Sequence, residues 1–138
     1  GRLDRIAQDN QNIKMIELDY LDFLEKWGKN PLFIKQKMRN KLALEKLYSI
    51  KINQDIDQLI LSLQSLGAGN MPSLWDTIDV FNFPVMLLTG AEDEKYSRIA
   101  LDCLQLIPRS KWVNISHSCH NVHLEQQSEF IKAIKSFL

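Results

Sequence analysis

Cysteine, proline and glycine are scarce in this sequence, and histidine is confined to one short stretch. The 138 residues contain two cysteines, four prolines and five glycines. Two cysteines cannot form a disulfide framework, which excludes a small disulfide-rich fold. The low proline and glycine content, together with 45% hydrophobic residues, argues against a disordered chain. The composition indicates one folded globular protein that is long enough to bury a core.

A long apolar run and a net charge are also missing. No apolar stretch reaches the roughly 18 residues that a membrane-spanning helix needs, and none resembles a signal peptide. Lys+Arg and Asp+Glu both number 17, so the formal net charge is zero, and nothing global points to nucleic acid or to a membrane surface. We therefore expect a cytoplasmic protein with neither a nucleic-acid nor a membrane partner.

Basic residues are unevenly spread along the chain. Between positions 26 and 51 a single acid, Glu45, accompanies eight basic residues: Lys26, Lys29, Lys35, Lys37, Arg39, Lys41, Lys46 and Lys51. One interpretation of such a run is a solvated helical face. The other is a basic lining for an anionic ligand.

The first half of the chain has a helical pattern. Residues 16–27 form one predicted helix because apolar side chains recur three or four positions apart: Ile16, Tyr20, Phe23, Leu24 and Trp27. Residues 53–66 repeat this spacing, with Asn53 as the expected N-cap and Gly67 as the expected C-cap. No strand pattern appears here, so we expect a helical unit over residues 1–70.

The second half alternates between strand and helix patterns. A continuous apolar run ends at Gly90, a helical pattern covers 94–108, a short strand pattern covers 111–116, and an amphipathic helix closes the chain. This β-α-β-α order is typical of parallel strands covered on both faces. Two strands cannot form such a sheet alone. The first residues also lie in a charged helical pattern and lack an initiator Met. We therefore expect the chain to be the C-terminal part of a larger protein.

Candidate chemical groups follow each of the two predicted strands. Glu92, Asp93 and Glu94 follow the first strand, and the histidines His117, His120 and His123 follow the second. Because the carboxyl ends of parallel strands meet at one edge of a sheet, an acid and a histidine from these loops can come together. A carboxylate that accepts a proton from one imidazole nitrogen orients the other nitrogen for proton transfer.

A metal site is the competing interpretation of this histidine cluster. His117, Cys119, His120 and His123 are all possible zinc ligands, but structural zinc sites separate two ligand pairs by a longer loop. Four ligands within seven residues would be hard to arrange tetrahedrally, so we expect no bound metal. Cys119 is not expected to be a nucleophile, because adjacent loop residues usually point apart.

The order of an acid strand, a histidine strand and a final helix resembles the C-terminal portion of the α/β-hydrolase fold. The stretches that carry this resemblance are PVMLLTGAEDEKY and CHNVHLEQQSEFIKAIKSFL. More narrowly, the chain resembles the 2-succinyl-6-hydroxy-2,4-cyclohexadiene-1-carboxylate synthase family of the menaquinone pathway, through SLQSLGAGNMPSLWDTI, HNVHLE and LDFLEKWGKNPLF.

The resemblance implies an α/β fold with a helical cap over 1–70 and the C-terminal part of the hydrolase core over 71–138. It makes Asp93 the acid of a Ser-His-Asp triad, with Glu92 as the weaker candidate, and His120 the base. The serine would lie upstream of this chain, which has no G-x-S-x-G elbow. The implied enzyme is a lyase that eliminates pyruvate from 2-succinyl-5-enolpyruvyl-6-hydroxy-3-cyclohexene-1-carboxylate without a cofactor, and this chain alone would be inactive.

The resemblance also implies three substrate-binding residues in the cap. Arg5, four positions before Asp9, matches an R-x-x-x-D pattern whose arginine binds a substrate carboxylate. Trp27 matches a cap tryptophan over the substrate. Lys51 lies near the position of a second cap arginine and keeps its charge but not its bidentate fork. The implied partners are a small anionic substrate and the N-terminal half of the same fold.

Two other functions stay open at the level of sequence. A general α/β-hydrolase esterase would keep the same triad and cap. A helical interaction module would use the strands only as a scaffold. An upstream G-x-S-x-G elbow after an apolar strand would support either enzyme and would exclude the module.

Overall fold

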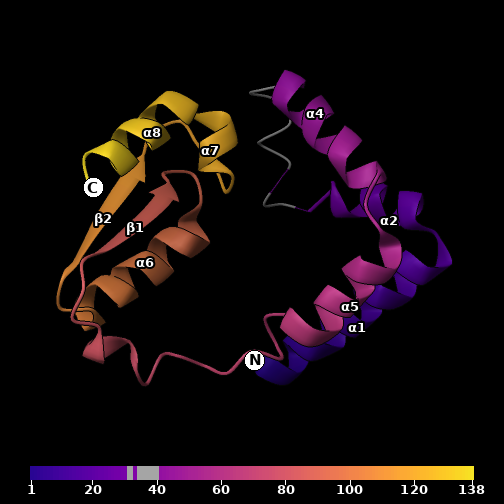
Figure 1. Ribbon diagram of the computed structural model, residues 1–138, viewed down its shortest axis with the longest axis horizontal. Coiled ribbons are helices and arrows are strands. Elements are labelled where there is room, and N and C mark those ends of the chain that lie inside the picture. Colours follow the sequence, from indigo (N-terminus) through magenta and orange to yellow (C-terminus); the bar gives the residue numbers. More distant parts are fainter. Residues whose placement is uncertain (31–32, 34–40) are drawn as a thin grey trace. The chain divides into compact units, whose positions relative to one another are not determined.

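The structure, a computed structural model, describes residues 1–30, 33 and 41–138 (Figure 1). It divides into two compact units. Unit 1 combines Gly1–Asn30 with Leu44–Ser73, and unit 2 combines Leu74–Leu138 with the described residues of 31–43. The chain passes from unit 1 to unit 2 after Ser73, where the sequence predicts a boundary after residue 70. Pro31, Leu32 and the basic residues Lys35, Lys37 and Arg39 lie outside the described residues.

Unit 1 is helical. Its elements are α1 (Arg2–Leu18), α2 (Tyr20–Trp27), α5 (Ile56–Leu66) and most of α4 (Lys41–Ile52). Helix α1 packs against α2 and against α5, which lies alongside it in Figure 1. Over the whole part of the chain that the structure describes, no helix is long and apolar enough to cross a membrane.

The single helix predicted over 16–27 is wrong at one residue. Asp19 is extended, with φ −159° and ψ 102°, and it separates α1 from α2. Its carboxylate accepts a hydrogen bond of 3.0 Å from the backbone N–H of Asp22, so it caps the new helix. The predicted apolar face still forms the core of unit 1: Ile16, Tyr20, Phe23 and Leu24, with Trp27 packed against them.

Helix α5 supplies the other wall of this core. Leu59, Ile60 and Leu63 pack against the buried cluster. The helix begins after Asp55, whose side chain accepts from the backbone N–H of Gln58 at 3.0 Å, so the prediction of Asn53 as its cap is wrong. The predicted end at Gly67 is confirmed.

Unit 2 contains the predicted β-α-β-α order. After a short 3₁₀ helix η2 (Ile78–Val80) come β1 (Val85–Gly90), α6 (Glu94–Leu106), β2 (Ser110–Ile115), α7 (Val122–Glu125) and α8 (Gln127–Lys135). The strands pair in parallel, with Val85 opposite Ser110 and Gly90 opposite Ile115. Because the strands are parallel and in this register, the loops that follow them leave the sheet at the same edge.

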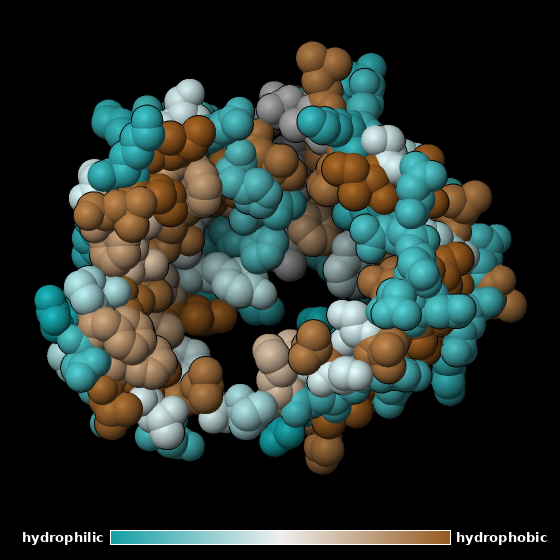
Figure 2. All heavy atoms as spheres, viewed as in Figure 1, coloured by the Kyte–Doolittle hydropathy of each residue, from teal (hydrophilic) through white to brown (hydrophobic). Residues whose placement is uncertain are grey.

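Helices cover both faces of the two strands (Figure 1). Helix α6 packs on one face, and α8 packs on the other. Alternate strand residues turn toward α7 and α8, where a second core forms from Ile115, Val122 and Ala133 with Met86, Leu88, Val113 and Phe130. Among the described residues the sheet has only these two strands, so both outer edges lack a strand partner. Residues 85–88 are accordingly only half-buried, and apolar side chains are visible at the surface among the hydrophilic ones in Figure 2.

Candidate active site

The loops after β1 and β2 are held together by backbone contacts. The N–H of Ala91 donates to the carbonyl of Ile115, and the N–H of Glu92 donates to the carbonyl of Ser118, both at 2.9 Å. Gly90 lies between the loops, and a Cβ on it would overlap the carbonyl oxygens of Ser118 and Cys119. The close approach of the two loops therefore requires glycine at position 90.

Asp93 follows β1 and serves as the N-cap of α6. Its Oδ1 accepts from the backbone N–H of Tyr96 at 3.2 Å, and its Oδ2 lies 2.7 Å from Nδ1 of His120. The residue is buried, with 6% of its surface exposed. The Tyr96 N–H and the His120 ring thus give both oxygens of Asp93 defined partners.

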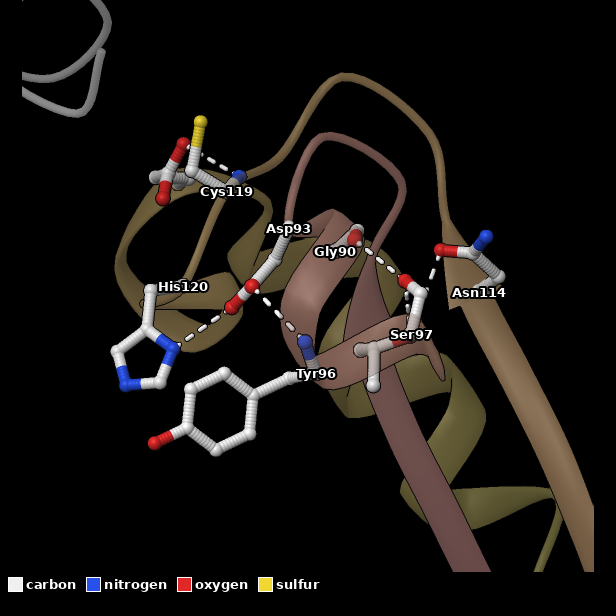
Figure 3. A network of polar contacts seen from close by, with 9 residues as sticks. Gly90, Asp93, Tyr96, Ser97, Asn114, Cys119 and His120 are labelled. Atoms are coloured by element: carbon white, nitrogen blue, oxygen red, sulfur yellow. Dashed lines mark hydrogen bonds and ion pairs between the residues drawn. The ribbon is translucent and has the colours of Figure 1, made fainter. Parts of the chain in front are cut away.

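His120 follows β2 and faces this carboxylate (Figure 3). The two residues are 27 positions apart in the chain. An ionised carboxylate accepts the proton of Nδ1 and leaves Nε2 as the nitrogen that can take up a proton. The His120 side chain is 30% exposed, so the pair combines a buried acid with an accessible base.

Aromatic rings and a cavity surround the imidazole. The Tyr96 ring centroid lies 4.6 Å from that of His120, and the Phe33 centroid lies 6.1 Å from it. A cavity of about 220 Å³ reaches from His120 and Asp93 down the end of β1 and along α6. Its wall is mostly apolar: Leu87, Leu88, Thr89, Gly90, Tyr96, Ile99, Ala100 and Cys103 complete the lining.

A hydroxyl network supports the acid loop from below. Nε1 of Trp112 donates to Oγ1 of Thr89 at 2.9 Å. The hydroxyls of Thr89 and Ser97 lie 3.3 Å apart, and Ser97 donates to the carbonyl of Gly90 at 3.3 Å (Figure 3). Sequence reasoning missed these residues and Tyr96. For the network, the sequence offers one signal, because Thr89 is a single hydroxyl residue at the end of an apolar strand. For Tyr96, the signal is its place three residues after Asp93, which caps the helix.

Glu92, the competitor of Asp93, faces a different group. Its Oε2 lies 3.8 Å from Sγ of Cys119. The backbone N–H of Cys119 donates to Glu125 at 3.0 Å, and the cysteine is buried. The geometry thus brings Asp93, rather than Glu92, to the histidine. Cys119 is adjacent to His120 in the chain, but it contacts Glu92 and Glu125.

The other two histidines have separate surroundings. His117 has a positive φ of 56°, and its carbonyl accepts from the side chain of Gln126. The ring of His123 lies 6.0 Å from that of Phe130. Within the described ranges no group of three or more His, Cys, Asp or Glu side chains is arranged to hold a metal ion.

The predicted substrate-binding arginine lies in unit 1 and forms an ion pair. Arg5 donates from Nε to Oδ2 of Asp9 at 3.2 Å, and its Nη2 lies 3.0 Å from Oδ1. Asp9 is buried, with 2% of its surface exposed, whereas the Arg5 side chain is 48% exposed. The carboxylate holds one edge of the guanidinium, which leaves further N–H donors for a ligand.

Trp27 and Lys51 also lie in unit 1. Trp27 packs on Phe23, with ring centroids 5.7 Å apart. The backbone carbonyl of Lys51 accepts from the Tyr20 hydroxyl at 2.7 Å, and burial lowers the pKa of the Lys51 ammonium. Both residues therefore lie beside the part of the unit 1 core that α2 forms. Arg5 lies near the opposite end of α1, about 16 Å along the helix axis from Ile16, so Arg5 does not share their location.

Comparison with known proteins gives a consistent set of relatives, although no protein-family model matches the chain. A Bacillus subtilis (strain 168) protein with the provisional name 2-succinyl-6-hydroxy-2,4-cyclohexadiene-1-carboxylate synthase is 30% identical over 138 residues, which are 99% of this chain and 50% of that protein. The chloroplastic protein PHYLLO of Arabidopsis thaliana is 28% identical over 148 residues, covering 100% of this chain and 8% of that protein. The solved structure of MenH from S. aureus matches with a TM-score of 0.94 at 30% identity, over 99% of this chain and 52% of that one. This chain thus spans about half the length of the Bacillus subtilis relative and of the solved structure.

Proposed function

Since this chain is a relative of the MenH-like 2-succinyl-6-hydroxy-2,4-cyclohexadiene-1-carboxylate synthases, and has the C-terminal portion of the α/β-hydrolase fold as its sequence predicts, we propose that it carries the acid and base of a lyase in menaquinone biosynthesis. The observation that carries the proposal is the 2.7 Å contact between Asp93 and His120. We expect this lyase to act in the cytoplasm.

The proposed reaction is the elimination of pyruvate from 2-succinyl-5-enolpyruvyl-6-hydroxy-3-cyclohexene-1-carboxylate. A C–H bond next to a carbonyl breaks, a ring double bond forms, and the C–O bond to the enolpyruvyl group breaks. The leaving group takes up a proton and becomes pyruvate. His120 accepts a proton at Nε2 from a serine upstream of this chain, which makes the serine a base toward the substrate. Asp93 keeps the proton of the imidazole on Nδ1 and stabilises the imidazolium that forms.

The substrate carries several carboxylates, which gives the basic residues of unit 1 a proposed role. Arg5 presents its remaining N–H donors to one carboxylate while Asp9 orients it. Lys51 offers a positive charge beside the core of α2. Trp27 offers an apolar ring surface. The reaction as proposed needs no metal or organic cofactor.

The proposed macromolecular partner is the N-terminal half of the same fold, which would also supply the serine. Strand β1 pairs with β2 on one side only, in the part of the chain that the structure describes. Residues 87–90 of β1 line the mostly apolar cavity that His120 borders. A further parallel strand at this edge would satisfy the free backbone groups of β1 and bury the cavity wall. Its carboxyl end would then lie near His120.

The test is pyruvate release from the purified substrate by the protein in its natural length. We expect turnover that is lost in His120→Ala and retained in His117→Ala, a matched histidine variant of the same loop. Turnover that survives His120→Ala but is lost in His117→Ala would overturn the assignment of the base. Hydrolysis of simple esters without any pyruvate release would favour a general esterase instead.

A further inference from the structure

Tyr96 contacts both members of the proposed acid–base pair through different parts of the residue. Its backbone N–H donates to Oδ1 of Asp93 at 3.2 Å. Its ring lies against His120, with centroids 4.6 Å apart and planes tilted by 47°. Figure 3 shows the tyrosine ring beside the imidazole and the two dashed contacts that meet at the Asp93 carboxylate.

These contacts have separate causes in the local structure. The N–H contact exists because Asp93 caps α6, and the third residue of a capped helix turns its N–H toward the cap. Any residue except proline at position 96 would provide it. The ring contact depends on the side chain, because an aromatic ring packs against an imidazole with a favourable electrostatic interaction that an aliphatic side chain lacks. Substituting the side chain therefore separates the role of the ring from the capping of the helix.

The ring has two physical effects on the imidazole. It restricts the rotation of the partly exposed His120 side chain, so that Nδ1 stays aligned with Asp93. It also attracts a cation through the negative face of its π system, and His120 becomes a cation when it accepts a proton. The second effect is larger in the transition state than in the resting enzyme, because the charge on the imidazole develops during proton transfer.

We propose that Tyr96 is a positioning residue whose aromatic ring holds His120 in line with Asp93 and stabilises its protonated form. The proposal rests on the function proposed above for the pair. It assigns the role to the ring and not to the hydroxyl, since the contact involves the ring. Tyr96→Phe should therefore preserve the positioning of His120, which a non-aromatic side chain would lose.

Three variants of the protein in its natural length test this inference. Tyr96→Phe keeps the ring, and Tyr96→Leu removes it while leaving the backbone N–H in place. Tyr48→Leu is the matched control, because Tyr48 is an exposed tyrosine of α4 in the other unit. If Tyr96→Leu does not fold, Tyr96→Met replaces it as a flexible side chain without a ring.

The first measurement is the steady-state rate of pyruvate release. We expect Tyr96→Leu to lower kcat about tenfold, the size of one cation–π contact in a partly desolvated site. KM should change little, because the residue acts through His120 and not on the substrate. Tyr96→Phe and Tyr48→Leu should stay near the wild type. A kcat of Tyr96→Leu equal to that of the wild type, or a Tyr96→Phe as slow as Tyr96→Leu, would overturn the proposal.

The second measurement does not depend on the reaction. A histidine proton that is shared with a carboxylate gives a low-field proton resonance, which His120→Ala assigns. We expect this resonance in the wild type and in Tyr96→Phe, and its weakening or loss in Tyr96→Leu. If the wild type releases no pyruvate, the proposed function fails, but this comparison still tests the ring. An unchanged resonance in Tyr96→Leu would contradict the positioning role.

Discussion

Gly90 approaches the carbonyl oxygen of Cys119 so closely that any side chain at position 90 would overlap it. This approach joins the loop that carries Asp93 to the loop that carries His120. The two loops also share a backbone hydrogen bond, from Glu92 to Ser118 at 2.9 Å. The spacing of the acid and the base is therefore set by a backbone contact that only glycine permits.

Gly90→Ala should lower both stability and turnover. The added methyl group would push the Cys119 carbonyl away, and His120 would move with it. Overpacking of this kind costs about 1–3 kcal/mol. Thermal unfolding and pyruvate release would measure the two effects. Gly1→Ala is the control, because its methyl group would meet only Asp4 at 3.8 Å. A fully active and stable Gly90→Ala would show that the loops adjust without cost.

Asp93 and His120 should behave as one unit in kinetics. We expect His120→Ala or Asp93→Asn to lower kcat by about 10³–10⁴-fold, on the scale of other triads. The double variant should be little slower than the slower single variant, because both residues act in the same proton transfer. Multiplicative losses in the double variant would mean that the two residues act independently.

Asp93 should have a second, separable role in stability. Asp93→Asn keeps a side chain that can cap α6, whereas Asp93→Ala removes the acceptor for the Tyr96 N–H. We expect Asp93→Ala to be less stable than Asp93→Asn by about 1 kcal/mol, although both variants lose turnover. Denaturant unfolding of the two proteins would measure the difference. Equal stabilities would mean that the cap contributes nothing.

Arg5 should matter for both stability and substrate affinity. Arg5→Ala leaves the buried carboxylate of Asp9 without its ion pair, which we expect to cost about 1–3 kcal/mol. Adding Asp9→Asn should recover most of this stability, because the buried negative charge is removed. The KM for the substrate should stay raised in the double variant. Recovery of KM together with stability would make Arg5 a purely structural residue.

The buried ammonium of Lys51 should lower the stability of the folded protein. Burial lowers the pKa of its ammonium below the usual value of 10.5, so the folded state binds this proton less tightly than the unfolded state does. The wild type therefore gains stability as pH rises from the folded pKa toward 10.5. Lys51→Met should be more stable than the wild type near neutral pH, and the difference should shrink at alkaline pH. Its KM should rise if Lys51 binds the anionic substrate.

Thermal unfolding at several pH values checks the stability part of this prediction. Lys46→Met, an exposed lysine of the same helix, is the control and should show no such pH-dependent gain. A Lys51→Met variant that is less stable than the wild type at neutral pH would contradict the prediction.

The 138 residues alone should fold poorly. Both strands have an unpaired edge within the described part of the chain, and α6 exposes Leu101 and Leu106, each by 42%. Free edges and apolar surface favour aggregation. We expect a soluble protein that unfolds cooperatively only when the N-terminal half of the fold is present. Scanning calorimetry would detect the cooperative transition. A sharp melt of the isolated, monomeric chain would contradict this expectation.

Local sequence patterns determined the elements and their cores. The spacing from Ile16 to Trp27 identified the buried face of unit 1, and the apolar run ending at Gly90 identified β1. Such patterns succeed because periodic burial acts on residues that are close in the chain. The boundaries were less predictable. Asp19 interrupts the pattern because its side chain caps a new helix. The apolar period does not register this preference of aspartate for capping over continuing a helix.

The sequence by itself therefore determined which residues could do chemistry, and the tertiary structure decided which of them meet. Three acids and three histidines were available, and the parallel register of β1 and β2 set one of each face to face. Glu92 instead faces Cys119, and Arg5 is paired with a buried Asp9. The Tyr96 ring reaches His120 only because α6 starts at Asp93. The contacts of Asp93 with His120 and of Glu92 with Cys119 each join residues 27 positions apart, and such packing leaves no periodic mark in the sequence.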